Sequence, residues 1–138
     1  MTDKIFIDTN IFVYAYTADD KNKNEIACNL LRENVVKNNI FISTQIINEF
    51  YSVMTKYKHS HGQIEYYVKE ITEQTIVSSL DLKKIERCFR VKEKYGYSWW
   101  DSLVLTSALE DGCSILYSED LQNGQIIENW LKIVNPFM

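Results

Sequence analysis

Five short apolar runs, separated by longer segments in which apolar residues recur at helical spacing, constrain the fold of this chain most strongly. Continuous apolar runs of this length are typical of strands buried on both faces, and strands that alternate with helices form parallel sheets. We therefore expect an α/β protein with a central parallel sheet of about five strands and helices on both faces. The expected strands lie at residues 5–7, 40–42, 75–77, 114–117 and 131–134.

The segments between these strands carry the caps and the apolar spacing of helices. In the helix after residue 81, the spacing turns Leu82, Ile85 and Phe89 toward the core. The segment at 99–111 is apolar on nearly every side, which predicts a central, mostly buried helix. For Trp99 and Trp100 at its start, we favour core packing over base stacking. Helices are expected over residues 11–16, 23–37, 46–57, 60–73 and 99–111, and the basic residues expected to face solvent after residue 81 are Lys83, Lys84, Arg87 and Arg90.

Four acidic residues from separate segments are expected at one edge of the sheet. Asp8 directly follows the first strand, and Asp120 lies just past the strand at 114–117. Glu49 lies about one turn into the helix after the second strand, beside its apolar stripe, and Asp101 lies in the first turn of the buried helix. Right-handed crossovers bring the carboxyl ends of all parallel strands to the same edge, where such sheets bind ligands.

Carboxylates gathered in this way favour a divalent cation, because like charges raise each other's pKa unless a cation offsets them. Hard oxygen ligands without Cys or His suit Mg²⁺ or Mn²⁺. Such a cation can activate water and offset charge during phosphodiester hydrolysis. Thr9, Asn10 and Ser118 are candidates for hydrogen bonds that orient the ligands. The pattern therefore predicts a catalytic metal site.

Each acid also has an ordinary structural interpretation. Asp8 can cap the helix that follows it, and Asp101 fits the acidic position of a capping box. Glu49 can be a solvated helix residue, and Asp120 can form an Asx-turn, with Glu119 as a rival ligand. The functional interpretation depends on all four acids lying together.

Size and composition limit the remaining possibilities. With 138 residues the chain is close to the commonest domain size, so we expect a single domain over 1–138. Its three widely spaced cysteines predict reduced thiols in a cytoplasmic protein. No apolar run approaches the ~20 residues that a membrane span needs. The net charge of −4 argues weakly against a basic nucleic-acid-binding face, although acids around a cation would also make the count acidic.

An ordered set of motifs resembles the PIN domain family, and in particular the VapC-like toxins of bacterial type II toxin–antitoxin systems. The motifs extend over essentially the whole chain and are FIDTNI (6–11), NE (48–49), WDS (100–102), SEDLQNG (118–124) and VNPF (134–137).

The resemblance implies a three-layer α/β/α, PIN-like fold and an Mg²⁺- or Mn²⁺-dependent endoribonuclease that cleaves RNA. It further implies a homodimer and a cognate antitoxin whose tail blocks the acidic pocket. Gln122 and Asn123 stand where many relatives carry a further acid. The family's acidic positions carry over onto Asp8, Glu49, Asp101 and Asp120, and its small polar positions onto Asn10 and Ser118.

Three other functions compete with a toxin. A receiver-like signalling module would carry paired acids after the first strand and a Lys at the end of the fifth strand. Here a lone Asp8 is followed by Thr9 and Asn10, and the fifth strand leads into Asn135. A non-catalytic binding module could keep the same fold without activity, and a housekeeping RNA-processing PIN nuclease would share both fold and site.

Overall fold

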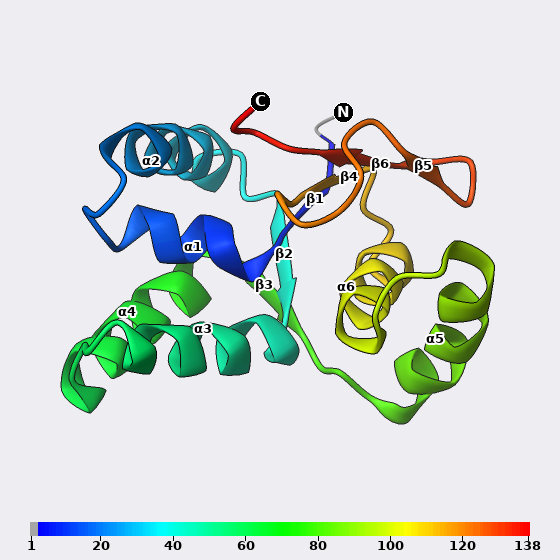
Figure 1. The fold of residues 1–138 in the computed structure, drawn as a ribbon, viewed down its shortest axis with the longest axis horizontal. Coiled ribbons are helices and arrows are strands. Elements are labelled where there is room, and N and C mark those ends of the chain that lie inside the picture. The colour runs from blue at the N-terminus through cyan, green and yellow to red at the C-terminus, as the bar shows by residue number, and fades with distance from the viewer. Residues whose placement is uncertain (1–2) are drawn as a thin grey trace.

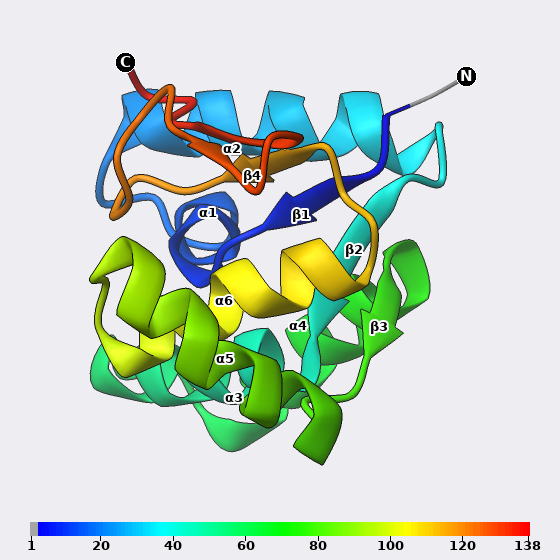
Figure 2. The same ribbon diagram turned by 90° about the vertical axis from the view of Figure 1, so that its right-hand side faces the viewer.

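The computed structural model describes residues 3–138, and within them the strands form one six-stranded sheet with helices on both faces (Figures 1 and 2). The strand order is β3-β2-β1-β4-β6-β5. The strands are β1 (Ile5–Ile7), β2 (Ile40–Ser43), β3 (Ile76–Ser78), β4 (Ile115–Tyr117), β5 (Ile126–Ile127) and β6 (Leu131–Val134). The helices are α1 (Thr9–Ala15), α2 (Lys21–Val35), α3 (Thr44–Lys56), α4 (His61–Gln74), α5 (Leu82–Tyr95) and α6 (Trp99–Glu110).

The way the chain winds through the sheet decides where a ligand can bind. β1 pairs in parallel with β2 on one side and with β4 on the other. The chain moves outward from β1 to β3 and then returns past β1 to β4, so the helices α1–α4 and the pair α5–α6 lie on opposite sides of the sheet (Figure 1). The winding direction therefore reverses between β1 and β4. The carboxyl ends of these two strands form a topological switch point, the usual ligand site of such sheets.

The predicted three-layer fold is confirmed, and the expected strands and helices lie within one or two residues of the observed ones. A capping box begins α4 at Ser60, where the expected helix over residues 60–73 starts. The Ser60 hydroxyl accepts from the backbone N–H of Gln63 at 3.2 Å, and the Gln63 side chain accepts from the Ser60 N–H at 3.0 Å. Five strands are parallel, as expected, and local sequence signals were sufficient to find them.

The sequence analysis missed β5, which pairs antiparallel with β6 at the edge of the sheet. Its two residues are too few to form an apolar run. The turn between β5 and β6 has positive φ at Glu128 (50°) and Asn129 (69°), a conformation that Glu seldom adopts. Neither the strand nor its turn therefore carries an ordinary sequence signal, and β5 makes the sheet mixed.

The expected orientation of α5 holds for Lys83 and Arg90, which are exposed, and is wrong for Leu82, Phe89 and Lys84. Leu82 and Phe89 are 68% and 63% exposed, whereas Lys84 is only 5% exposed. Lys84 can be buried because its ammonium group donates to the Ser78 hydroxyl at 2.7 Å and lies 3.9 Å from a carboxylate oxygen of Asp111. A buried charge requires such partners. These contacts hold the start of α5 against β3 and the end of α6, with Leu82 and Phe89 on the exposed face of the helix.

The expected burial of α6 is confirmed, because every residue from 102 to 109 is buried. The helix lies between the sheet and α5 (Figure 2). It ends where Gly112 adopts a φ of +73°, which glycine tolerates better than other residues. Core packing is wrong for Trp100, which is 61% exposed, whereas Trp99 is half-buried against Phe89.

None of the helices within residues 3–138 is both long and apolar enough to cross a membrane. The assignment of one domain to residues 1–138 stays a prediction.

Candidate active site

Two residues emerge side by side where β1 and β4 end. Ile7 pairs with Tyr117 in the sheet, and the N–H of Asp8 donates to the carbonyl of Tyr117 at 3.0 Å. Asp8 and Ser118 are therefore the first residues past two neighbouring parallel strands. The Ser118 hydroxyl donates to Asp8 Oδ2 at 2.8 Å, so the topological switch point has a direct polar link across it.

Asp8 is a buried carboxylate with few partners for its charge. Its side chain is 7% exposed and caps α1, with Oδ1 accepting from the Thr9 N–H at 2.8 Å. Burial raises the pKa of Asp8 to about 7, the charges of Glu49 and Asp120 add to the rise, and the two hydrogen bonds oppose it. The helix-capping role is thus real. The cap alone does not explain why a charge should be buried here.

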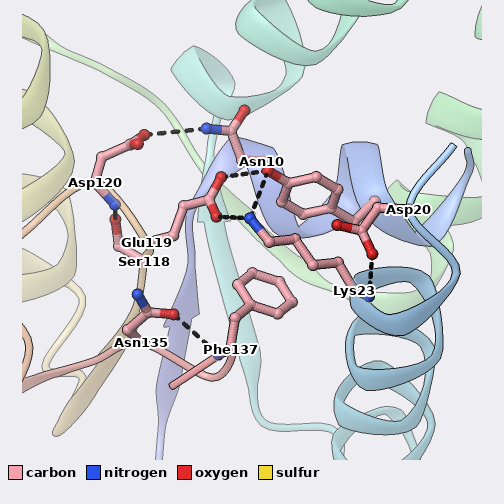
Figure 3. Close-up of polar contacts among 9 residues, drawn as sticks. Asn10, Asp20, Lys23, Ser118, Glu119, Asp120, Asn135 and Phe137 are labelled. Carbon is pink, nitrogen blue, oxygen red and sulfur yellow. Dashed lines mark hydrogen bonds and ion pairs between the residues drawn. The ribbon is translucent and has the colours of Figure 1, made fainter.

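Asp120 lies in the loop after β4 and faces the first turn of α1. Its Oδ2 accepts from Asn10 Nδ2 at 3.1 Å, and its N–H donates to the Ser118 hydroxyl at 3.2 Å (Figure 3). Partial burial raises the pKa of Asp120, and the charges of Glu119 and Asp101 raise it further. Asn10 and Ser118, two of the polar residues that the sequence singled out, therefore both contact Asp120 through hydrogen bonds.

Glu119, the rival ligand, points away from Asp120 and toward α1 and α2 (Figure 3). Its Oε1 accepts from the Tyr14 hydroxyl at 2.5 Å, and its Oε2 pairs with Lys23 Nζ at 2.8 Å. Lys23 Nζ also lies over the ring of Phe137, 5.2 Å from its centroid. This contact brings the end of the chain into the cluster. Sequence reasoning missed Tyr14 and Lys23, because no local signal links residues so far apart in the chain.

Glu49 reaches the same edge from the second turn of α3. Its Oε1 accepts from the Thr9 hydroxyl at 3.0 Å, and Thr9 directly follows Asp8. Partial burial raises the pKa of Glu49, and the charges of Asp101 and Asp120 add to the effect. Glu49 is therefore not the freely solvated helix residue of the ordinary interpretation.

Asp101 enters from the other side of the sheet, in the first turn of α6. Its N–H donates to the Ser98 hydroxyl at 3.1 Å, but among residues 3–138 its carboxylate accepts no hydrogen bond. The capping box is therefore only half formed, and the carboxylate is free for another role. The negative charge of Asp101 raises the pKa values of both Glu49 and Asp120.

The four acids thus form one electrostatic group, although they come from four elements. As the side chains lie, no three or more His, Cys, Asp or Glu residues within 3–138 form a set that could hold a metal ion. The donor chemistry nevertheless fits a hard divalent cation, because all the donors are oxygen atoms and the carboxylates raise one another's pKa. Asp8 in particular is buried, and its pKa is raised to about 7. Bringing these carboxylates onto a cation would require side-chain movements.

A groove adjoins this group. It has a volume of about 560 Å³, within the usual range of ligand sites. One face of α3 supplies most of its wall, and Trp100 and Leu80 lie across from it. The residues that line it are Thr44, Gln45, Asn48, Glu49, Ser52, Leu80 and Trp100. Glu49 therefore belongs both to the acidic group and to the groove.

Comparison with known proteins gives a family and a fold. The family model described as PIN domain matches residues 5–123, and the comparison with curated protein sequences yields no match. Three similar solved structures are toxin proteins or their complexes. The VapC20 toxin of Mycobacterium tuberculosis, described as cleaving the sarcin–ricin loop, has a TM-score of 0.65 at 13% identity, covering 83% of this chain and 88% of the toxin.

The other two are complexes. VapBC2 of Rickettsia felis, bound to a DNA fragment from its promoter, has a TM-score of 0.67 at 19% identity, with 95% of this chain and 98% of that chain covered. A toxin–antitoxin complex from Klebsiella pneumoniae has a TM-score of 0.68 at 15% identity, with 96% and 97% covered. At such identities the likeness establishes the fold.

Proposed function

This chain belongs to the PIN domain family, and we propose that it is a metal-dependent endoribonuclease that hydrolyses phosphodiester bonds in RNA. The observation that carries the proposal is the convergence of four acids at the switch point between β1 and β4. Each of three acids has a pKa raised in part by the charges of others in the group. Such mutual repulsion is unfavourable in a protein without a role for it, and perturbed acids of this kind cluster at functional sites.

We assign the cation to carboxylates that approach from three directions. Asp8 and Asp120 approach from the ends of β1 and β4, Glu49 from α3, and Asp101 from α6. When bound, Mg²⁺ or Mn²⁺ would offset the negative charge that gathers on the phosphate during hydrolysis. The residues that would hold it are Asp8, Glu49, Asp101 and Asp120.

The neighbouring hydroxyl and amide groups have a positioning role in this proposal. Ser118 bonds both Asp8 and the backbone of Asp120, so one side chain fixes the distance between the two strand ends. Thr9 holds Glu49, and Asn10 holds Asp120. Because these donors also stabilise the ionised carboxylates, they keep the acids available as ligands near neutral pH.

We further propose that the protein acts in the cytoplasm as the toxin of a toxin–antitoxin pair, as a homodimer with a cognate antitoxin. Support comes from the fold, which matches toxin–antitoxin complexes over nearly the whole of both chains. Induced expression in a bacterial host would arrest growth, and the Asp101→Asn variant would not. Growth that continues with the active protein would instead favour a housekeeping nuclease.

The activity itself is tested by incubating structured RNA with the purified protein and Mn²⁺ or Mg²⁺, with and without EDTA. Asp101→Asn should abolish cleavage without disturbing the fold, because the Asp101 carboxylate accepts no hydrogen bond within residues 3–138. Asp19→Asn is the matched control, since it removes one charge from an exposed loop outside the group. Equal cleavage by Asp101→Asn, or cleavage that EDTA does not affect, would contradict the proposal.

A further inference from the structure

The exposure of Trp100 has no explanation in the packing of the fold. It starts a helix whose later residues are buried, yet 61% of it is exposed. The neighbouring Trp99 fixes α6 to α5, with its ring centroid 5.1 Å from that of Phe89. The attachment of the helix therefore does not need Trp100. A large exposed aromatic side chain at a groove beside acidic residues is typical of a binding surface.

Four polar residues of α3 line the groove beside Trp100 at helical spacing. Gln45, Asn48, Glu49 and Ser52 occupy successive turns of one face of α3, and all four line the groove. Their amide, carboxylate and hydroxyl groups can both donate and accept hydrogen bonds. Among the described residues that line the groove there is no Lys or Arg, so its chemistry suits the edge of a base better than a phosphate.

A hydrogen bond joins α3 and α6, the two helices that line the groove. Gln45 is only 5% exposed, and its Nε2 donates to the backbone carbonyl of Trp100 at 3.0 Å. Gln45 thus connects α3, which lies on one side of the sheet, to the first turn of α6 on the other. This hydrogen bond fixes the backbone of Trp100 at the edge of the groove.

We propose that this groove binds an unpaired nucleobase of the RNA substrate, with the Trp100 indole as its stacking surface. The inference rests on the proposed ribonuclease function, since it takes the substrate from that proposal. Glu49 lines the groove and belongs to the acidic group, and Asp101 directly follows Trp100. An RNA chain with its phosphate at the acids therefore extends into the groove with a neighbouring nucleotide.

This assignment requires the base that enters the groove to be unpaired. Bases inside a duplex are already stacked on each other, whereas unpaired bases can stack on an aromatic side chain and present their edges to protein amides. Stacking itself tolerates any base. Trp100 thus contributes affinity, and the exposed amide of Asn48 supplies any preference among bases.

Binding of a fluorescein-labelled single-stranded oligoribonucleotide, followed by anisotropy in EDTA and again in Ca²⁺, tests the inference. Trp100→Ala should weaken binding between roughly 5-fold and 150-fold, the range expected for loss of one stacked base. Trp100→Phe should restore most of the affinity, whereas Trp100→Leu should not. Trp130→Ala is the matched control, because Trp130 is also exposed, at 47%, but lies in the distant turn between β5 and β6.

Thermal unfolding tests whether the variant is still folded. The melting temperature of Trp100→Ala should stay within about 2 °C of that of the wild type, because the side chain is largely exposed. Equal RNA binding by the wild type and Trp100→Ala would overturn the proposal, as would no binding by the wild type in either condition. A change in self-association with unaltered RNA binding would assign the groove to a second copy of this chain and would also overturn it.

Photocrosslinking separates this inference from the proposed function. RNA carrying 5-iodouridine, irradiated with the protein and analysed by mass spectrometry, should crosslink to the peptide that contains Trp100. Crosslinking there without any RNA cleavage would support the groove and contradict the ribonuclease. Metal-dependent cleavage with crosslinks only elsewhere would support the ribonuclease and overturn the groove.

Discussion

Replacing Asp8 with asparagine should make the protein more stable at neutral pH when no divalent cation is present. Asparagine is as good a helix cap as aspartate. Its side chain can still accept from the Thr9 N–H and can meet the Ser118 hydroxyl, so both hydrogen bonds of Asp8 are kept. The substitution removes only the buried negative charge. Most substitutions of a buried polar residue destabilise, so a gain in stability would be diagnostic.

The magnitude follows from the pKa of Asp8, which burial raises from 3.8 to about 7. A rise of about 3 units, at 1.36 kcal/mol per unit, corresponds to about 4 kcal/mol of unfavourable free energy when Asp8 is ionised. Because the folded state holds the proton more tightly than the unfolded chain, the wild type keeps its full stability below about pH 4. It then loses about 4 kcal/mol as the pH rises to about 7.

Urea unfolding in EDTA, repeated at intervals from pH 4.5 to pH 8, measures this difference. The free energy of unfolding of Asp8→Asn should exceed that of the wild type by little at the acidic end and by about 4 kcal/mol at pH 8. Mn²⁺ should reduce this difference between the two proteins. A cation at 100 times its Kd adds about 2.7 kcal/mol to the wild type and less to Asp8→Asn, which should bind the cation more weakly.

A difference between the two proteins that does not change with pH would refute the reasoning about Asp8. A loss of stability in Asp8→Asn at pH 8 would do so more strongly. In that case the ionised carboxylate would be favourable in the folded state, as expected for an ordinary helix cap.

Three further substitutions test other contacts. Ser118→Ala removes a donor to Asp8, so it should raise the pKa of Asp8 further and lower Mn²⁺-dependent RNA cleavage by roughly tenfold, measured as a pH–rate profile. Lys84→Met leaves the carboxylate of Asp111 without its cation and should cost about 3 kcal/mol in urea unfolding, with partial recovery on adding Asp111→Asn. Gly112→Ala should cost about 1 kcal/mol in thermal unfolding, because the φ of +73° strains any residue with a Cβ.

Local sequence signals were enough to predict most of the fold. The runs around Phe6, Phe41 and Leu116 are continuous and apolar, so they read as buried parallel strands, and caps such as Ser60 set the starts of helices. Because strand ends share one edge, the position of Asp8 and Asp120 near each other also follows from the order of elements.

The errors arose where distant contacts override a local pattern. The burial of Lys84 depends on Ser78 and Asp111, which no helical wheel of α5 contains. The exposure of Trp100 could not be predicted from the sequence, because α6 is apolar on nearly every side. The spacing of its apolar residues therefore does not show which face of its first turn is exposed to solvent.

The acidic site shows the same limit. Glu119 and Asp120 are neighbours in the loop after β4, and from the sequence alone either could be the metal ligand. The ion pair of Glu119 with Lys23 turns its carboxylate aside, and the two residues lie 96 positions apart. Which of two adjacent acids joins the site was therefore decided by tertiary structure.

Mn²⁺ binding, measured by electron paramagnetic resonance of the free ion, is the most direct test of the claim that four acids form one cation site. The full chain should bind Mn²⁺, and each single amide substitution should weaken the affinity by roughly tenfold or more. The four variants are Asp8→Asn, Glu49→Gln, Asp101→Asn and Asp120→Asn, and Asp19→Asn should bind as the wild type does. Affinity that is unchanged in all four, or an absence of Mn²⁺ binding by the wild type, would contradict the account.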